Sequence, residues 1–153
     1  MIEIKGFLET SFLDWPGKLC SVLFLPSCNF RCPYCHNHSL IFHPERYATI
    51  PLEEIIDRTQ PLKNWIDGMC LTGGEPTLHA DLPSLIREIK QRQFLIKLDT
   101  NGSNPQMLET LIEKEEIDFA RLKEQIKDKV EGLVRKEEDT LTSVLSHRGR
   151  GEE

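Results

Sequence analysis

The sequence predicts an α/β fold in which helices cover a parallel β-sheet. Short apolar segments typical of buried strands alternate along the chain with segments of helical periodicity. This alternation favours parallel strands joined by right-handed crossovers. A length of 153 residues suits one domain, and 39% hydrophobic and 29% charged residues are ordinary for a globular protein.

The expected strands are short and mostly apolar. The first, Ile2–Leu8, alternates weakly between apolar and polar residues. Cys20–Leu25 is almost continuously apolar, as in a strand that is buried on both faces. Gly68–Thr72 and Phe94–Leu98 are the next core strands, and Ile117–Ala120 begins a fourth.

Helices are expected between these strands. Pro51–Trp65 has proline at its first turn and apolar residues at helical spacing, although Pro61 should break or kink it. Asp81–Gln93 and Asn104–Glu115 follow the next two strands. The sequence therefore alternates strand and helix up to the fourth core strand.

The composition changes at Arg121. Residues 121–153 contain no aromatic residue, and nearly half of them are charged. One helical stripe predicts a helix to about Lys136, before an end, SHRGRGEE, that we expect to be disordered. The stripe consists of Phe119, Leu122, Ile126, Val130 and Leu133. We therefore divide the chain into a core, residues 1–120, and a charged amphipathic helix with a tail, residues 121–153.

Charge and cysteine content exclude several classes of protein. A net charge of −6 argues against a broad nucleic-acid surface, and no apolar run approaches the ~20 residues that span a membrane. The start, MIEIKGFLET, is charged where a signal peptide needs an apolar core, so we expect a cytoplasmic protein. Cys20 and Cys70 lie in apolar strands and should pack in the core.

Three unusual loops follow the three core strands. They are CNFRCPYC after Cys20–Leu25, GGEP after Gly68–Thr72, and DTNG after Phe94–Leu98. The carboxyl ends of parallel strands meet at one edge of a sheet, and ligands bind beyond that edge. We therefore expect the three loops to form one site.

Three cysteines dominate the first loop. Cys28, Cys32 and Cys35 have the spacing C-x3-C-x2-C, which can direct three thiolates at one inorganic centre. The spacing favours a cluster of four irons, in which one iron keeps an open position for a substrate. It leaves open a zinc site completed by one of three histidines, which are His36, His38 and His43.

The other two loops offer polar groups. Gly73 and Gly74 allow close approach of the backbone to a ligand, and Glu75 could accept a hydrogen bond from an ammonium group. Asp99 and Asn101 could bind hydroxyl groups or a cation. Taken alone, each loop is more often a plain turn from a strand into a helix.

Taken together, the motifs resemble those of a known family. CNFRCPYCHN, followed by LTGGEP and LDTNGSNP, resembles the radical S-adenosylmethionine (SAM) superfamily. The segment SFLDWPGKLCSVLFLPSCNFRCPYCHN is similar to activating proteins of anaerobic ribonucleoside-triphosphate reductase and related glycyl-radical enzymes. The resemblance covers about residues 1–120, and it favours iron–sulfur over zinc.

The resemblance implies a set of ligand contacts. Cys28, Cys32 and Cys35 would hold a [4Fe-4S] cluster whose fourth iron binds the amino and carboxylate groups of SAM. Tyr34 and His36 would contact the adenine. The remaining expected contacts are Gly73, Gly74 and Glu75 at the methionine amino group, and Asp99, Thr100 and Asn101 at the ribose or carboxylate side, with a monovalent cation in some activases.

The resemblance also implies a radical reaction. The reduced cluster would cleave SAM to methionine and a 5′-deoxyadenosyl radical, which would take hydrogen from a glycine of a partner such as anaerobic ribonucleotide reductase. A flavodoxin- or ferredoxin-like protein would supply the electron. No side chain of this chain would be catalytic, since the cofactors carry the chemistry. Nucleic acid and membranes are not expected partners.

One departure from the family concerns the end of the chain. Family members continue with further β/α units to a six-stranded partial barrel, whereas residues 121–153 lack that pattern. We therefore expect a truncated (β/α) barrel with parallel strands and a C-terminal helical tail. Two alternatives remain, a metal-binding module without catalysis and an inactive fragment with an open strand edge.

Overall fold

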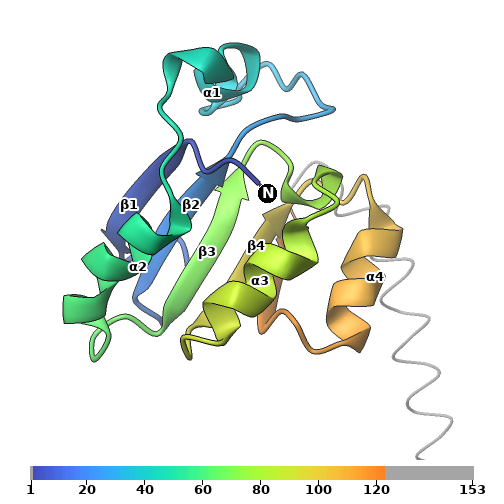
Figure 1. The fold of residues 1–153 in the computed structure, drawn as a ribbon. Helices are drawn as coiled ribbons and strands as arrows, with labels where there is room; N and C mark the ends of the chain where they lie inside the picture. Colours follow the sequence, from blue (N-terminus) through green and yellow to red (C-terminus); the bar gives the residue numbers. More distant parts are fainter. Residues whose placement is uncertain (1, 123–153) are drawn as a thin grey trace, which may run out of the picture.

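A single sheet forms the centre of the computed structural model, which describes residues 2–122 (Figure 1). The strand order is β1-β2-β3-β4-β5. The strands are β1 (Gly6–Ser11), β2 (Cys20–Leu25), β3 (Gly68–Gly73), β4 (Leu95–Thr100) and β5 (Phe119–Leu122). The strands from β2 to β5 run parallel to one another, which confirms the predicted α/β fold.

The first strand departs from the expected all-parallel sheet. β1 is antiparallel to β2, and it begins at Gly6 rather than Ile2. Only a short loop joins β1 to β2, and a parallel pair needs a crossover of a dozen or more residues. The length of this connection therefore decides the direction of β1.

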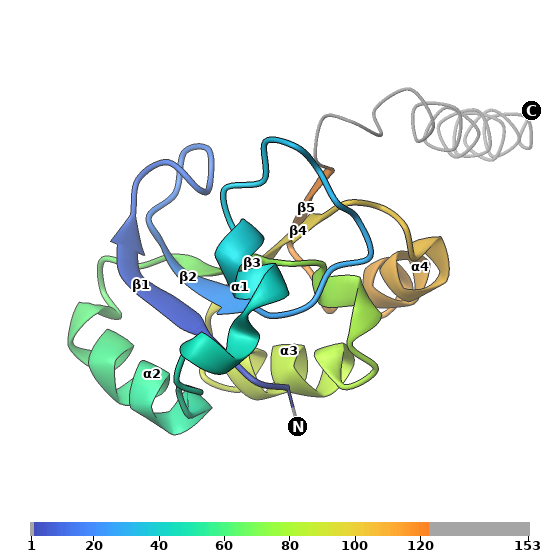
Figure 2. The same cartoon turned by 90° about the horizontal axis from the view of Figure 1, so that it is seen from above.

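Helices cover one face of the sheet (Figure 2). These helices are α2 (Leu52–Thr59), α3 (Leu82–Lys90) and α4 (Pro105–Glu113), whereas the short helix α1 (His38–Phe42) lies above the sheet. Three 3-10 turns accompany them, η1 (Pro44–Arg46), η2 (Gln60–Leu62) and η3 (Pro76–Leu78). Pro61 lies in η2, directly after the last turn of α2, as the sequence predicts.

The main core lies between the sheet and the helices α2, α3 and α4. Leu23, Leu71 and Leu98 from the strands pack with Ile55 and Ile86 from the helices. On the opposite face, a smaller cluster joins Trp15 of the β1–β2 loop to Cys20, Val22 and Cys70. Both cysteines are completely buried, which confirms the prediction that they belong to the core.

One predicted helix begins where the structure has a strand. Phe119 and Leu122 lie in β5, where Phe119 is paired with Lys97 and Leu122 with Thr100. Backbone pairing with β4 outweighs the helical spacing of these two residues. The strand also passes residue 120, where we expected the core to end. The helix expected to Lys136 and the disordered end lie outside the described residues.

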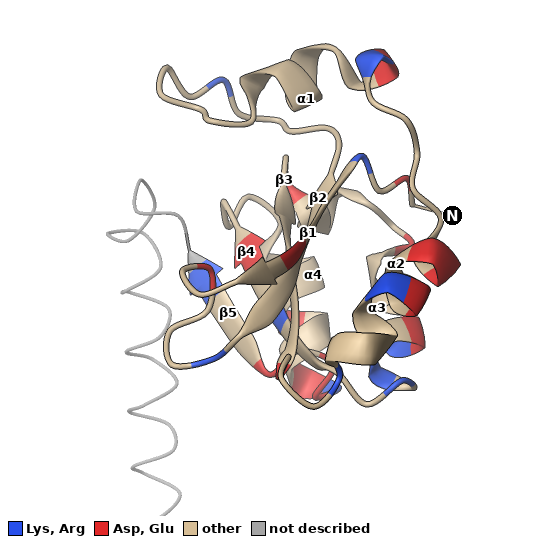
Figure 3. Cartoon of the chain, turned by 90° about the vertical axis from the view of Figure 1, so that its left-hand side faces the viewer, with Lys and Arg blue, Asp and Glu red and all other residues tan. Residues whose placement is uncertain are grey.

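Charged residues of both signs lie on the helices α2 and α3 (Figure 3). Arg92 after α3 pairs with Glu53 of α2 at 2.5 Å, and Arg58 of α2 pairs with Glu9 of β1 at 2.7 Å.

Within residues 2–122, no helix has the length and apolar character needed to cross a bilayer.

Candidate cluster and cofactor site

The three loops meet beyond the carboxyl ends of β2, β3 and β4, where the segment with α1 lies above the sheet (Figure 1). Backbone hydrogen bonds join the first two loops, from Gly74 N to Leu25 O and from Glu75 N to Ser27 O, each 2.8 Å long. Asn37 Nδ2 also donates to Gly73 O at 3.0 Å. The predicted convergence of the loops is therefore present in the fold.

Gly73 and Gly74 make the close contact between these loops possible. Gly73 has a φ of +109°, and a Cβ there would lie 2.5 Å from Leu25 O. A Cβ on Gly74 would lie 1.8 Å from Ser27 O. The space beside both glycines is thus filled by the chain itself. Close packing of the two loops therefore requires glycine at both positions, apart from the expected approach to a ligand.

Glu75 ties the second loop to the third. Its side chain is completely buried. The Oε1 atom accepts hydrogen bonds from Thr77 N at 3.1 Å, Thr77 Oγ1 at 2.6 Å and Thr100 Oγ1 at 2.6 Å. Oε2 accepts one from Asn101 N. A buried carboxylate with this many donors holds both loops in place.

Asn101 ties the third loop to the cysteine loop. Its Nδ2 donates to Asn29 Oδ1 at 3.0 Å and also to Cys28 Sγ at 3.7 Å. Asn29 Oδ1 also accepts from Ser103 Oγ at 3.2 Å. Sequence reasoning placed Asn101 in the site but missed Asn29, because an asparagine between two cysteines carries no distinguishing pattern.

The three cysteines lie half-buried in one loop. Phe30 N donates to Cys28 Sγ at 3.4 Å, and Cys35 N donates to Cys32 O at 3.2 Å in a tight turn. Arg31 braces the loop, since its Nη1 donates to Cys28 O at 2.7 Å and its guanidinium lies 4.8 Å from the ring centroid of Phe42.

These residues fit an iron–sulfur cluster by their chemistry. Three thiols come from one short loop, and two N–H groups already point at Cys28 Sγ, which stabilises a thiolate. Within residues 2–122, however, no three Cys, His, Asp or Glu side chains are gathered as metal ligands. Binding of a metal therefore requires the thiols to draw together. The same observation applies to the zinc alternative, whose His43 instead pairs with Glu45 at 3.4 Å.

Tyr34 and His36 are exposed residues at the end of the cysteine loop. Tyr34 is 88% exposed. His36 lines a cavity of about 310 Å³ with Asn37 and Tyr47. Both side chains are thus accessible to a ligand, but the loop does not bring them against Glu75 or Asn101.

Asp99 lies on the face of the sheet opposite the helices, and Thr100 lies on the helix side. Thr100 is fully buried and donates to Glu75. Asp99 is only partly buried and forms an ion pair with Lys97, whose side chain is fully buried. Sequence reasoning missed Lys97, because a lysine in a strand ordinarily indicates a solvent-facing position.

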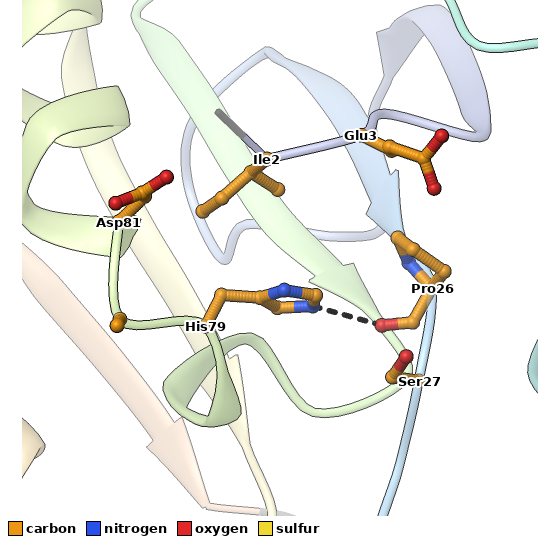
Figure 4. A pocket seen from close by; sticks show the side chains of 7 residues that line it. Ile2, Glu3, Pro26, Ser27, His79 and Asp81 are labelled. Atoms are coloured by element: carbon orange, nitrogen blue, oxygen red, sulfur yellow. Dashed lines mark hydrogen bonds between the residues drawn. The ribbon is translucent and has the colours of Figure 1, made fainter.

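His79 is a half-buried residue of the loop after β3. Its Nε2 donates to Pro26 O at 2.9 Å, which joins the loop after β3 to the end of β2 (Figure 4). With Glu3 and Asp81 it lines a cavity of about 280 Å³. His79 is therefore another link between the loops.

The two core cysteines differ chemically from the loop cysteines. Burial raises the pKa of the Cys20 thiol to about 11, and Asp14 adds to this effect. Burial and Asp99 raise the pKa of Cys70 above its ordinary range. Both thiols stay protonated at neutral pH, so neither is suited to hold a metal.

Comparison with known proteins identifies the family. The model of the radical SAM superfamily matches residues 22–134. Two proteins of Methanocaldococcus jannaschii named "putative glycyl-radical enzyme activating enzyme" are similar to this chain. One is 36% identical over 138 residues, covering 89% of this chain and 56% of that protein. The other is 33% identical over 93 residues, covering 60% of this chain and 33% of that protein.

Pyruvate formate-lyase-activating enzyme of Staphylococcus aureus is 35% identical over 110 residues, covering 65% of this chain and 43% of the enzyme. This chain thus matches about half or less of the length of these relatives. Members of the superfamily use a [4Fe-4S] cluster and SAM. The family match covers most of the chain, and its three loops form one site in the fold; the chain belongs to the radical SAM superfamily.

Proposed function

We propose that this chain binds a [4Fe-4S] cluster and SAM and generates a glycyl radical on a partner enzyme. The observation that carries the proposal is the junction of three loops around Cys28, in which Asn101 contacts its sulfur and Glu75 holds Asn101. The names of the relatives point to the same reaction class.

The three loop cysteines would hold the cluster, and the backbone N–H of Phe30 and the amide of Asn101 would stabilise the thiolate of Cys28. When bound, the reduced cluster supplies the electron that cleaves the sulfonium C–S bond of SAM. Glu75 and Thr100 keep the loops at a fixed distance, so the cofactor meets a preorganised edge of the sheet.

The cofactor contacts proposed for SAM follow the order of the loops. Tyr34 and His36 serve the adenine, Gly73 and Gly74 the methionine amino group through their backbone, and Asn101 the ribose or carboxylate side. The resemblance also implies contacts from Glu75, Thr100 and Asp99, but we leave these out of the proposal, because Glu75 and Thr100 bond to each other and Asp99 pairs with Lys97. We assign this chemistry to residues 1–120. The partner we propose is anaerobic ribonucleotide reductase, with electrons from a flavodoxin- or ferredoxin-like protein.

The test is cleavage of SAM by the full chain. The protein is reconstituted anaerobically with iron and sulfide, reduced with dithionite and given SAM, and 5′-deoxyadenosine is measured. Product above that of a Cys32→Ala variant supports the proposal. A full cluster without product contradicts it and indicates a metal-binding module without catalysis.

The partner is tested separately. Incubation of the active protein with anaerobic ribonucleotide reductase or with pyruvate formate-lyase should give the doublet signal of a glycyl radical in electron paramagnetic resonance. A signal with pyruvate formate-lyase alone would correct the choice of partner.

A further inference from the structure

A buried ion pair lies on the face of the sheet that the helices leave free. Lys97 and Asp99 are two residues apart on β4, so both side chains point to this face. The side chain of Lys97 is 0% exposed and that of Asp99 is 15% exposed, and the ammonium contacts Asp99 Oδ1 directly. Charges are seldom buried in this way without a partner.

Cys70 of β3 completes a triangle with these two residues. Lys97 Nζ donates to Cys70 Sγ at 3.5 Å, and Cys70 Sγ donates to Asp99 Oδ2 at 3.6 Å. Because the pKa of Cys70 is raised, its thiol keeps the proton that this second contact needs. Both oxygens of Asp99 are therefore engaged by side chains of the sheet.

The surroundings make the charge of Lys97 necessary. Trp15, Cys20 and Val22 form an apolar cluster with Cys70 on this face, and Leu95 packs against it. Arg121 stands opposite Asp99 in the strand register but is exposed to solvent. If the ammonium were removed, the carboxylate of Asp99 would face this apolar cluster without its direct counter-charge.

We propose that Lys97 is the fixed counter-cation of Asp99 and takes the place that an exchangeable monovalent cation would otherwise fill. The resemblance to activases implies a monovalent cation in some members at the side of the site where Asp99 lies. In this chain the carboxylate is committed to Lys97 and Cys70, so the charge at the start of the third loop is balanced within the fold. The inference concerns the chain without cofactors and does not depend on the proposed reaction.

The experiment compares thermal unfolding of the full chain in chloride salts of sodium, potassium, ethylammonium and choline at equal ionic strength. The proteins are wild type, Lys97→Ala, Asp99→Asn and the double variant. Lys97→Ala leaves room for a small cation beside Asp99, whereas choline is too large to enter this space. Lys18→Ala is the matched control, because Lys18 pairs with Asp67 at 3.5 Å with both side chains partly exposed.

The wild type should unfold at the same temperature in all four salts. Lys97→Ala should unfold about 10 °C lower in choline chloride, and sodium, potassium or ethylammonium should restore part of the loss. The double variant should lose this salt response, and Lys18→Ala should shift by less than about 3 °C in every salt.

Two results would overturn the proposal. One is that sodium or potassium stabilises the wild type relative to choline and that the Asp99→Asn variant lacks this effect. Asp99 would then already bind an exchangeable cation. The other is a Lys97→Ala protein, or one too unstable to fold, whose defect neither small cations nor Asp99→Asn relieve. In that case Lys97 acts through its packing alone.

Discussion

The amide nitrogen of Asn101 lies 3.7 Å from the sulfur of Cys28, although the two residues are 73 positions apart in the chain. Asn101 is almost completely buried, and its backbone N–H is held by Glu75. The loop after β4 is thereby fixed against the sulfur of a proposed cluster ligand. This contact connects the stability of the sheet edge with the chemistry of the metal site.

Asn101→Ala should lower the reduction potential of the reconstituted cluster without preventing its assembly. An N–H donor to a cysteine sulfur stabilises the more negative, reduced state, so its loss favours the oxidised cluster. The measurement is a redox titration followed by electron paramagnetic resonance. Ser103→Ala is the control, because it removes a bond to Asn29 and leaves Cys28 untouched. Equal potentials in both variants would contradict this role of Asn101.

Cys32→Ala should reduce bound iron from roughly four atoms per chain to background, because two thiolates from a short loop do not retain a four-iron cluster. Cys20→Ala should keep the iron, since Cys20 lies inside β2. Iron and sulfide analysis after anaerobic reconstitution, with the absorption spectrum, gives the result. Unchanged iron in Cys32→Ala would show that the ligand assignment is wrong.

Gly74→Ala should cost about 3 kcal/mol of folding free energy, because the new Cβ meets the backbone of Ser27 and neither segment can move easily. Gly17→Ala provides the comparison. Gly17 has a φ of +74° but open space around it, so only backbone strain of about 1–2 kcal/mol is expected. Urea unfolding measures both. Similar losses would mean that the two loops are less tightly joined than the structure shows.

Glu75→Gln should destabilise the protein by about 2 kcal/mol even without cofactors. The amide group of glutamine would face a hydrogen-bond donor, since both carboxylate oxygens accept bonds in the native site. Glu88→Gln on the exposed side of α3 should leave the free energy of unfolding unchanged. If Glu75→Gln is as stable as the wild type in urea, the carboxylate serves a ligand rather than the fold.

Cys20 should make the protein less stable at alkaline pH. Its pKa is raised from 9.0 to about 11, so between these values the folded chain keeps a proton that the unfolded chain loses. This stabilisation is complete below pH 9 and is lost as the pH rises toward 11. Between pH 8 and 10 the wild type should lose about 1 kcal/mol more than Cys20→Ala, measured by urea unfolding under reducing conditions. Parallel losses in both proteins would contradict the shift.

The sequence alone determined the alternation of strand and helix and the convergence of the three loops. Apolar runs and helical spacing are local properties, and parallel strands bring their carboxyl ends to one edge whatever the details of packing. The spacing of Cys28, Cys32 and Cys35 likewise depends only on neighbouring residues. These features could therefore be predicted, and the family match agrees with them.

The tertiary structure decided the direction of β1, the strand at Phe119 and the partners of individual polar groups. Glu75 is bonded to Thr100, which is 25 positions away, and Asn101 to Cys28, which is 73 positions away. Lys97 pairs with Asp99 only two positions away, but the fold buries this pair on the free face of the sheet. Burial turns an ordinary lysine of β4 into the counter-charge of Asp99, and no pattern of residue types along one strand records burial of that kind. Long-range packing therefore fixed the electrostatics of the site, whereas local sequence fixed its place in the fold.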